Sequence, residues 1–162
     1  MLKILTLTLL LINLLFADTY NFTELRYSDA LDKSIELKGE ITFTDNSLNI
    51  KYPNKDKELN YIDSTLSYFE NDSKVQLDEE QTQKIVNYFE ILTLVHNGNE
   101  DEMKKMFSIK NLNAKTQLTP IGILENYIAY IELYKKENEL SKIKLFLQNN
   151  DSITISIYEK IR

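Results

Sequence analysis

Ile35-Glu-Leu37-Lys-Gly39-Glu-Ile41-Thr-Phe43 decides the fold of this chain, because its apolar residues occupy odd positions and its charged residues even ones. Alternation with a period of two predicts a half-buried β-strand. The turn-forming residues 44–47 follow, and Leu48-Asn-Ile50-Lys-Tyr52 then returns with the same alternation. Pro53 ends this second strand, since proline cannot donate to a ladder. Together the two segments predict an antiparallel hairpin with one buried face.

The same period extends over most of the chain. Further strands are expected at residues 20–27, 59–62, 65–69, 74–77, 107–112, 116–118, 128–134, 140–147 and 152–158. In the first of these, a break in parity between Phe22 and Leu25 predicts a β-bulge. So many alternating segments predict a single antiparallel sheet of about ten strands, as in curled sheets and barrels.

One segment, at about residues 79–106, changes to the helical period. Asp78 and Gln81 form a capping-box pattern, and Gly98 suits the residue that follows a helix. The apolar positions between them are Ile85, Val86, Tyr88, Phe89, Ile91, Leu92, Leu94 and Val95. A second, short helix is expected after Asn99, with three acidic residues in its first turn. The sequence therefore predicts a mainly β fold with one helical insert.

The N-terminal residues have the pattern of a secretory signal peptide. Lys3 precedes an apolar run from Ile4 to Phe16, and the small residue Ala17 follows it. This run is thirteen residues long, whereas crossing a bilayer takes about 20 residues. Abundant Lys, Asn and Ile are typical of an AT-rich bacterial genome. We therefore expect cleavage after residues 1–17, a single domain over residues 18–162, and a periplasmic location.

Composition and motifs argue against several classes of function. The formal net charge of −6 is unfavourable for nucleic-acid binding, which uses clustered Lys and Arg. The chain has no cysteine and one histidine, His96, and it lacks the phosphate-loop and nucleophile motifs. Residues 97–102 lack the ligand spacing of a calcium loop. We therefore expect no enzyme activity, no cofactor and no metal site.

The apolar surface of the expected helix is wider than packing on one sheet requires. Two interpretations are open: the helix fills the core, or it forms a lid over an apolar cavity for an acyl chain. Shared strand parity selects the residues that would line such a cavity: Ile41, Phe43, Ile50, Tyr52, Leu66, Tyr68, Val75, Ile131, Leu133, Leu145 and Ile155. From the lid, Ile85, Phe89 and Leu92 would face them.

Several short motifs resemble those of the LolA family of periplasmic lipoprotein carriers. Residues 59–64 followed by 65–69 are similar to the family's apolar strand, Asp-Gly turn and Leu-aromatic strand, with Asp63-Ser64 at the turn. Gln117-Leu-Thr-Pro120 resembles its Leu-Thr-Pro motif, and Tyr52-Pro53 its strand-ending aromatic and proline. The resemblance spans residues 22–157. It implies an incomplete, half-open antiparallel β-barrel covered by a helical lid, with an apolar cavity and no cofactor.

The resemblance also implies a function, namely a carrier or chaperone that binds the acyl chains of lipoproteins and moves them from the inner to the outer membrane. The implied partners are an acylated lipoprotein or another lipid, an inner-membrane release complex and an outer-membrane acceptor, and we expect a monomer. The alternative is a lipid-binding, protein-interaction or sensing domain of the envelope with a different ligand. In the family, a strand arginine closes the lid. Here Arg26 lies too early and the matching strands carry Lys38 and Lys51, so closure is expected to depend mainly on apolar contact.

Overall fold

The computed structural model describes residues 17–161. The expected signal peptide, apart from Ala17, lies outside the described residues, and its cleavage stays a prediction. The strands are β1 (Asp18–Ser28), β2 (Lys33–Phe43), β3 (Ser47–Tyr52), β4 (Lys57–Ile62), β5 (Thr65–Glu70), β6 (Ser73–Val75), β7 (Phe107–Leu112), β8 (Lys115–Pro120), β9 (Ile128–Lys136), β10 (Glu139–Leu147) and β11 (Ser152–Lys160). The helices are α2 (Glu79–Asn97) and α3 (Glu100–Met106), with short 3-10 helices η2 (Pro53–Lys55) and η3 (Gly122–Asn126).

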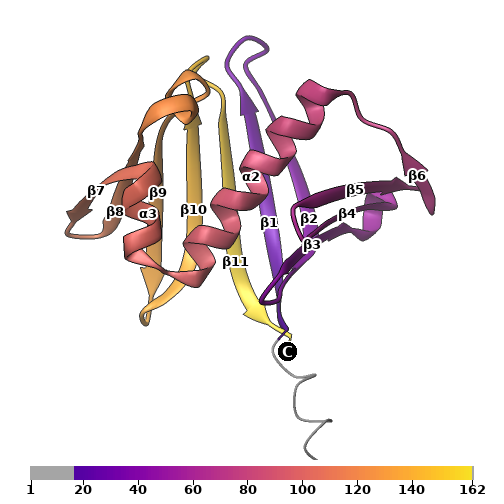
Figure 1. Cartoon of the computed structure of the whole chain (residues 1–162), viewed down its shortest axis with the longest axis horizontal. Coiled ribbons are helices and arrows are strands. Elements are labelled where there is room, and N and C mark those ends of the chain that lie inside the picture. Colours follow the sequence, from indigo (N-terminus) through magenta and orange to yellow (C-terminus); the bar gives the residue numbers. More distant parts are fainter. Residues whose placement is uncertain (1–16, 162) are drawn as a thin grey trace, which may run out of the picture.

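All eleven strands form one antiparallel sheet in the order β6-β5-β4-β3-β2-β1-β11-β10-β9-β8-β7. The edge strands β6 and β7 follow one another in the chain, so α2 and α3 must carry the chain from one edge to the other. Figure 1 shows α2 running diagonally across one face of the curved sheet. This arrangement confirms the predicted fold class, a mainly β open sheet covered by a helical insert.

The ends of α2 lie where the capping pattern predicts them. The backbone N–H of Gln81 donates to Asp78 Oδ1 at 2.7 Å, and the Gln81 side chain accepts from the Asp78 N–H at 3.4 Å. Gly98 follows the helix with φ of 63°, a left-handed conformation that glycine adopts without steric cost. Among residues 17–161, no helix is long and apolar enough to cross a membrane.

The core lies between α2 and the face of the sheet that it covers, here called the inner face. Cross-strand neighbours supply it, for example Ile41 opposite Ile50 and Ile143 opposite Ile155, all about 1 % exposed. Gly39 also points inward, since a Cβ there would lie 2.9 Å from the Phe22 ring and would clash with a backbone carbonyl. A glycine is needed here because the Lys51 carbonyl and the Phe22 ring occupy the space that a side chain would take.

The predicted bulge between Phe22 and Leu25 is wrong. β1 pairs with β2 in continuous register from Asp18 to Ser28, and its one register shift, against β11, lies between Asn21 and Phe22. The parity of β1 does not change: Phe22 and Glu24 both face inward and are 1 % and 0 % exposed, while Leu25 faces outward. A buried glutamate, rather than a bulge, explains the irregular pattern.

Candidate ligand-binding site under helix α2

Helix α2 is held differently at its two ends. Its C-terminal half is core: Phe89, Leu92 and Val95 are at most 6 % exposed, and the Phe89 ring packs edge-on against Tyr61 of β4 at 6.0 Å. In the N-terminal half, Ile85 is only half-buried. The wide apolar surface of the helix belongs to one core cluster with residues from both halves of the curved sheet, such as Ile50 of β3 and Leu145 of β10. The N-terminal half is therefore where space remains between helix and sheet.

At the C-terminal end, His96 packs its ring on Phe43, with centroids 3.8 Å apart and planes within 7°. Asp18 Oδ2 lies 3.8 Å from His96 Nε2. Burial lowers the pKa of His96 below its ordinary 6.5, although the Asp18 charge acts in the opposite direction. His96 therefore anchors the helix end as an aromatic group that is neutral at pH 7.

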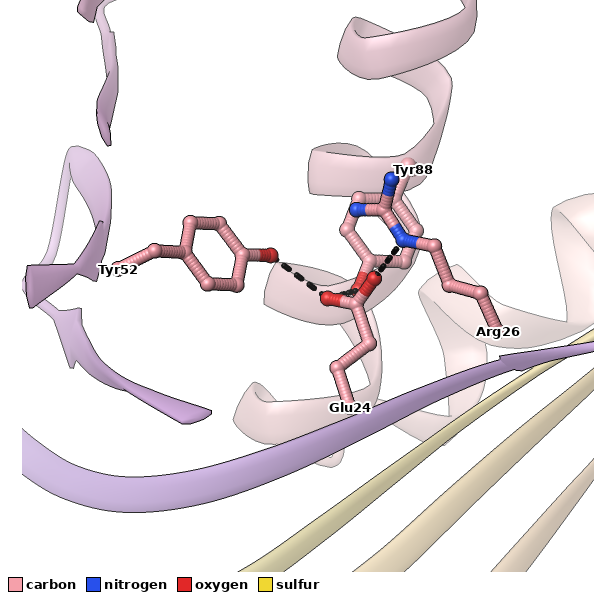
Figure 2. A network of polar contacts seen from close by, with 4 residues as sticks. All are labelled: Glu24, Arg26, Tyr52 and Tyr88. Carbon is pink, nitrogen blue, oxygen red and sulfur yellow. Dashed lines mark hydrogen bonds and ion pairs between the residues drawn. The ribbon is translucent and has the colours of Figure 1, made fainter. Parts of the chain in front are cut away.

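Under the middle of α2, the Glu24 carboxylate is the centre of a polar network (Figure 2). Its Oε1 accepts from Arg26 Nε on the same strand. Its Oε2 accepts from the Tyr52 hydroxyl at 2.6 Å and from the Tyr88 hydroxyl of α2 at 3.3 Å. The carboxylate is fully buried, and this set of donors compensates for the water that burial removes.

The network also shifts the pKa values of the groups that donate to Glu24. Burial and the neighbouring Glu24 carboxylate raise the pKa values of Tyr52 and Tyr88 well above 10, so both hydroxyls stay protonated and can donate. Burial acts to lower the pKa of Arg26, but the charge and hydrogen bond of Glu24 outweigh it and the pKa is raised. Arg26 therefore remains a cation beneath the helix.

The network changes the expectation about how the helix is held. Apolar contact was expected to hold it in the main, because no arginine matches the family's latch. The Tyr88 contact with Glu24 ties α2 to β1, and the Tyr61 hydroxyl of β4 donates to Glu90 of α2 at 3.2 Å. Polar contacts therefore add to the apolar ones.

Two pockets flank the N-terminal half of α2, each of about 520 Å³, within the usual range for small-molecule sites. The β4 pocket lies between α2 and strands β1–β5 and includes Leu37, Leu59 and Phe89 in its wall. The β10 pocket lies between α2, η3 and strands β9–β11 and includes Ile91 and Leu145. Both pockets are lined by Arg26, Lys84, Ile85 and Tyr88.

A third hollow, of about 600 Å³, lies beside η2 and strands β3–β5. Its lining carries both signs of charge, including Lys51, Asp56, Glu58 and Asp72. This mixture favours neither an apolar nor a singly charged ligand. The two pockets beside α2 are therefore the better candidates for a binding site.

The predicted cavity residues lie on the inner face, but only some of them reach a pocket. Tyr52 and Tyr68 line the β4 pocket, and Leu145 lines the β10 pocket. The buried core takes up Ile41, Phe43, Ile50, Ile131, Leu133 and Ile155, while Leu66 and Val75 are half-buried. Of the predicted lid residues, Ile85 lines both pockets, Phe89 lines the β4 pocket, and Leu92 is buried in the core.

Sequence reasoning missed Glu24, Arg26 and Tyr88 as site residues. Glu24 and Arg26 share the parity of Tyr20 and Phe22, which was a usable signal. The apolar Leu25 hid this signal, because its opposite parity indicated a bulge. Within residues 17–161, no group of three or more His, Asp and Glu side chains is arranged to hold a metal ion.

No family model matches the sequence, and no curated protein matches it either. Among solved structures, a LolA superfamily protein from Nitrosomonas europaea is similar at 9 % identity and a TM-score of 0.40, covering 90 % of this chain and 86 % of its own. A DUF1329 family protein from Desulfovibrio piger is similar at 8 % identity and a TM-score of 0.31, covering 96 % of this chain and 89 % of its own. The chain thus has a distant structural similarity to LolA superfamily and DUF1329 structures.

Proposed function

We propose that this protein is a carrier of the bacterial envelope that binds acyl chains of lipoproteins or of another lipid beside helix α2. The observation that carries the proposal is the pair of apolar-walled pockets between α2 and the inner face of the sheet. The signal-peptide pattern of residues 1–17 supports a periplasmic location. The proposed partners are an acylated lipoprotein or another lipid, taken from an inner-membrane complex and passed to an outer-membrane acceptor.

The energetics suit binding that can be reversed. Burying one methylene contributes about 0.8 kcal/mol, so a long acyl chain gains on the order of 10 kcal/mol from full burial. A carrier must also release its cargo, so part of that gain has to be offset by contacts that the protein makes with itself when the pockets are empty. Ile85 and Tyr88 of α2 line the pockets, so movement of the N-terminal half of the helix would open or close both of them. Leu92 and Val95 would keep the C-terminal half in the core during that movement.

The test places a bulky side chain in the pockets. The chain contains no tryptophan, so in Ile85→Trp the new indole both fills the space and serves as the single tryptophan reporter. We expect this variant to fold and to bind a fluorescent fatty acid at least tenfold more weakly than the unmodified protein. Val86→Trp is the matched control, because Val86 is the next half-buried residue of α2 and lines neither pocket.

Two results would remove the basis of the carrier proposal. One is absence of fatty-acid binding by the unmodified protein after delipidation. The other is mass spectrometry of the protein purified from the native periplasm that finds no lipid or lipoprotein with it. In that case an interaction or sensing domain on the same fold, recognising a protein partner by its surface, is the next hypothesis.

A further inference from the structure

The charged side chains that line the β4 pocket are all cationic. Four cationic side chains line it, from Arg26, Lys55, Lys57 and Lys84, and its lining contains no Asp or Glu. This one-sidedness stands out in a chain whose formal net charge is −6. The remaining wall is apolar or aromatic over most of its extent, with Leu37, Leu59, Leu77, Ile85 and Phe89 among its residues.

The carboxylates that pair with these cations lie outside the lining. Lys57 Nζ is 3.2 Å from Glu70 Oε1, and Lys84 Nζ is 2.6 Å from Glu80 Oε1. The four side chains of these pairs are each more than a third exposed. Exposed ion pairs contribute little to stability, so their partners can be exchanged at small cost. The two lysines can therefore turn to an anion at the pocket without breaking a buried interaction.

Arg26 is arranged to contact a ligand. It pairs with the buried Glu24 through Nε, and Figure 2 shows its two terminal nitrogens on the side away from the Glu24 carboxylate. About half of the side chain is exposed, and it lines both pockets. A guanidinium that pairs through Nε keeps its two terminal nitrogens as a fork, which fits a carboxylate or phosphate with two parallel hydrogen bonds.

We propose that the β4 pocket binds a single-chain amphiphile with an anionic head group, whose carboxylate or phosphate lies between Arg26 and Lys84 and whose acyl chain lies against the apolar wall. This inference rests on the proposed acyl-chain function and names the class of ligand. The cationic rim neutralises the head group, while the chain replaces water along Leu59 and Phe89. Neutral lipids with the same chain would gain only the second contribution.

The test compares ligands that share one chain and differ in head group. The purified chain is titrated at pH 7 with hexadecanoate, with hexadecyl phosphate and with neutral 1-hexadecanoylglycerol, each below its aggregation concentration, by isothermal calorimetry. We expect at least one of the anions to bind about tenfold more tightly than the neutral lipid, and that preference to shrink as salt is added. The tighter of the two anions identifies the head group.

Charge-removing variants locate the preference. Lys84→Gln should weaken binding of the anion about two- to fivefold and leave binding of the neutral lipid unchanged. Lys104→Gln is the matched control, since Lys104 forms a similar exposed pair with Glu100 in α3 at 2.9 Å and lines neither pocket. The double variant Glu24→Gln/Arg26→Gln removes both charges of this pair together and should reduce the preference by more than Lys84→Gln does. If it does not fold, Lys55→Gln/Lys84→Gln decides the question.

The possible failures are distinguishable. If the neutral lipid binds as tightly as both anions, or if Lys84→Gln and Lys104→Gln behave alike, the anionic ligand is refuted while the acyl-chain function stands. If none of the three lipids binds, the proposed function fails and the ligand class fails with it.

Discussion

The network around Glu24 allows a sharp test with two tyrosines that donate to the same atom. The hydroxyls of Tyr52 and Tyr88 both point at Glu24 Oε2, at 2.6 and 3.3 Å. A short hydrogen bond to a buried carboxylate contributes about 1.5–3 kcal/mol, whereas a long one contributes less than about 1 kcal/mol. We therefore expect Tyr52→Phe to lower the free energy of unfolding by about 2 kcal/mol and Tyr88→Phe by less than half of that.

Urea denaturation followed by circular dichroism measures the difference. With a urea slope of about 1–3 kcal/mol/M, Tyr52→Phe should lower the midpoint by about 1 M. Tyr158→Phe is the control, because Tyr158 is 60 % exposed and surface changes usually stay within about 0.5 kcal/mol. In a Glu24→Gln background the acceptor loses its charge, so the effect of Tyr52→Phe should shrink. Equal losses from Tyr52→Phe and Tyr88→Phe, or a larger loss from the second, would refute this account of the network.

The same network predicts a dependence on alkaline pH. Burial and the Glu24 charge raise the pKa of Tyr52 above its ordinary 10. A raised pKa means that the folded state holds its proton more tightly, so this stabilisation is complete below about pH 10 and is lost as the pH rises further. Tyr52→Phe should therefore flatten the fall in stability above pH 10, and an unchanged slope would contradict the assignment.

Three further changes test the packing of α2 and of the sheet. Phe89→Ala should lower the free energy of unfolding by about 3–5 kcal/mol and also weaken acyl-chain binding, because Phe89 is 1 % exposed and lines the β4 pocket. A near-normal melting temperature would instead mean that this part of α2 is a lid outside the core. We expect the unmodified protein to lose stability as the pH falls below about 6.5, since burial lowers the pKa of His96 and the unfolded chain binds the proton more tightly. His96→Gln should reduce this loss in denaturation at several pH values, and an unchanged slope would contradict the account. Gly39→Ala should lower the free energy of unfolding by about 1–3 kcal/mol in the same denaturation assay, because the new Cβ meets a backbone carbonyl and the Phe22 ring. Unchanged stability would show that the strands adjust freely.

The sequence alone predicted most of the fold because the relevant signals are local. Alternation in residues 35–43 and 48–52 reports which side of a strand meets water, and the observed β2 and β3 contain both segments. The capping box at Asp78 and the glycine at 98 are likewise short-range, since each concerns backbone groups within one turn. Strand parity also selected residues that meet in the core, such as Ile41 and Ile155.

Tertiary structure alone decided the polar part of the site. The burial of Glu24 depends on Tyr52, Tyr88 and Arg26 being close enough to compensate its charge, and two of these donors come from other elements. No local pattern reports that proximity, so the sequence indicated a bulge where the structure has an inward-facing carboxylate. The division of the apolar positions between core and pockets has the same origin. It depends on where α2 crosses the curved sheet, which is set by packing between segments far apart in the chain.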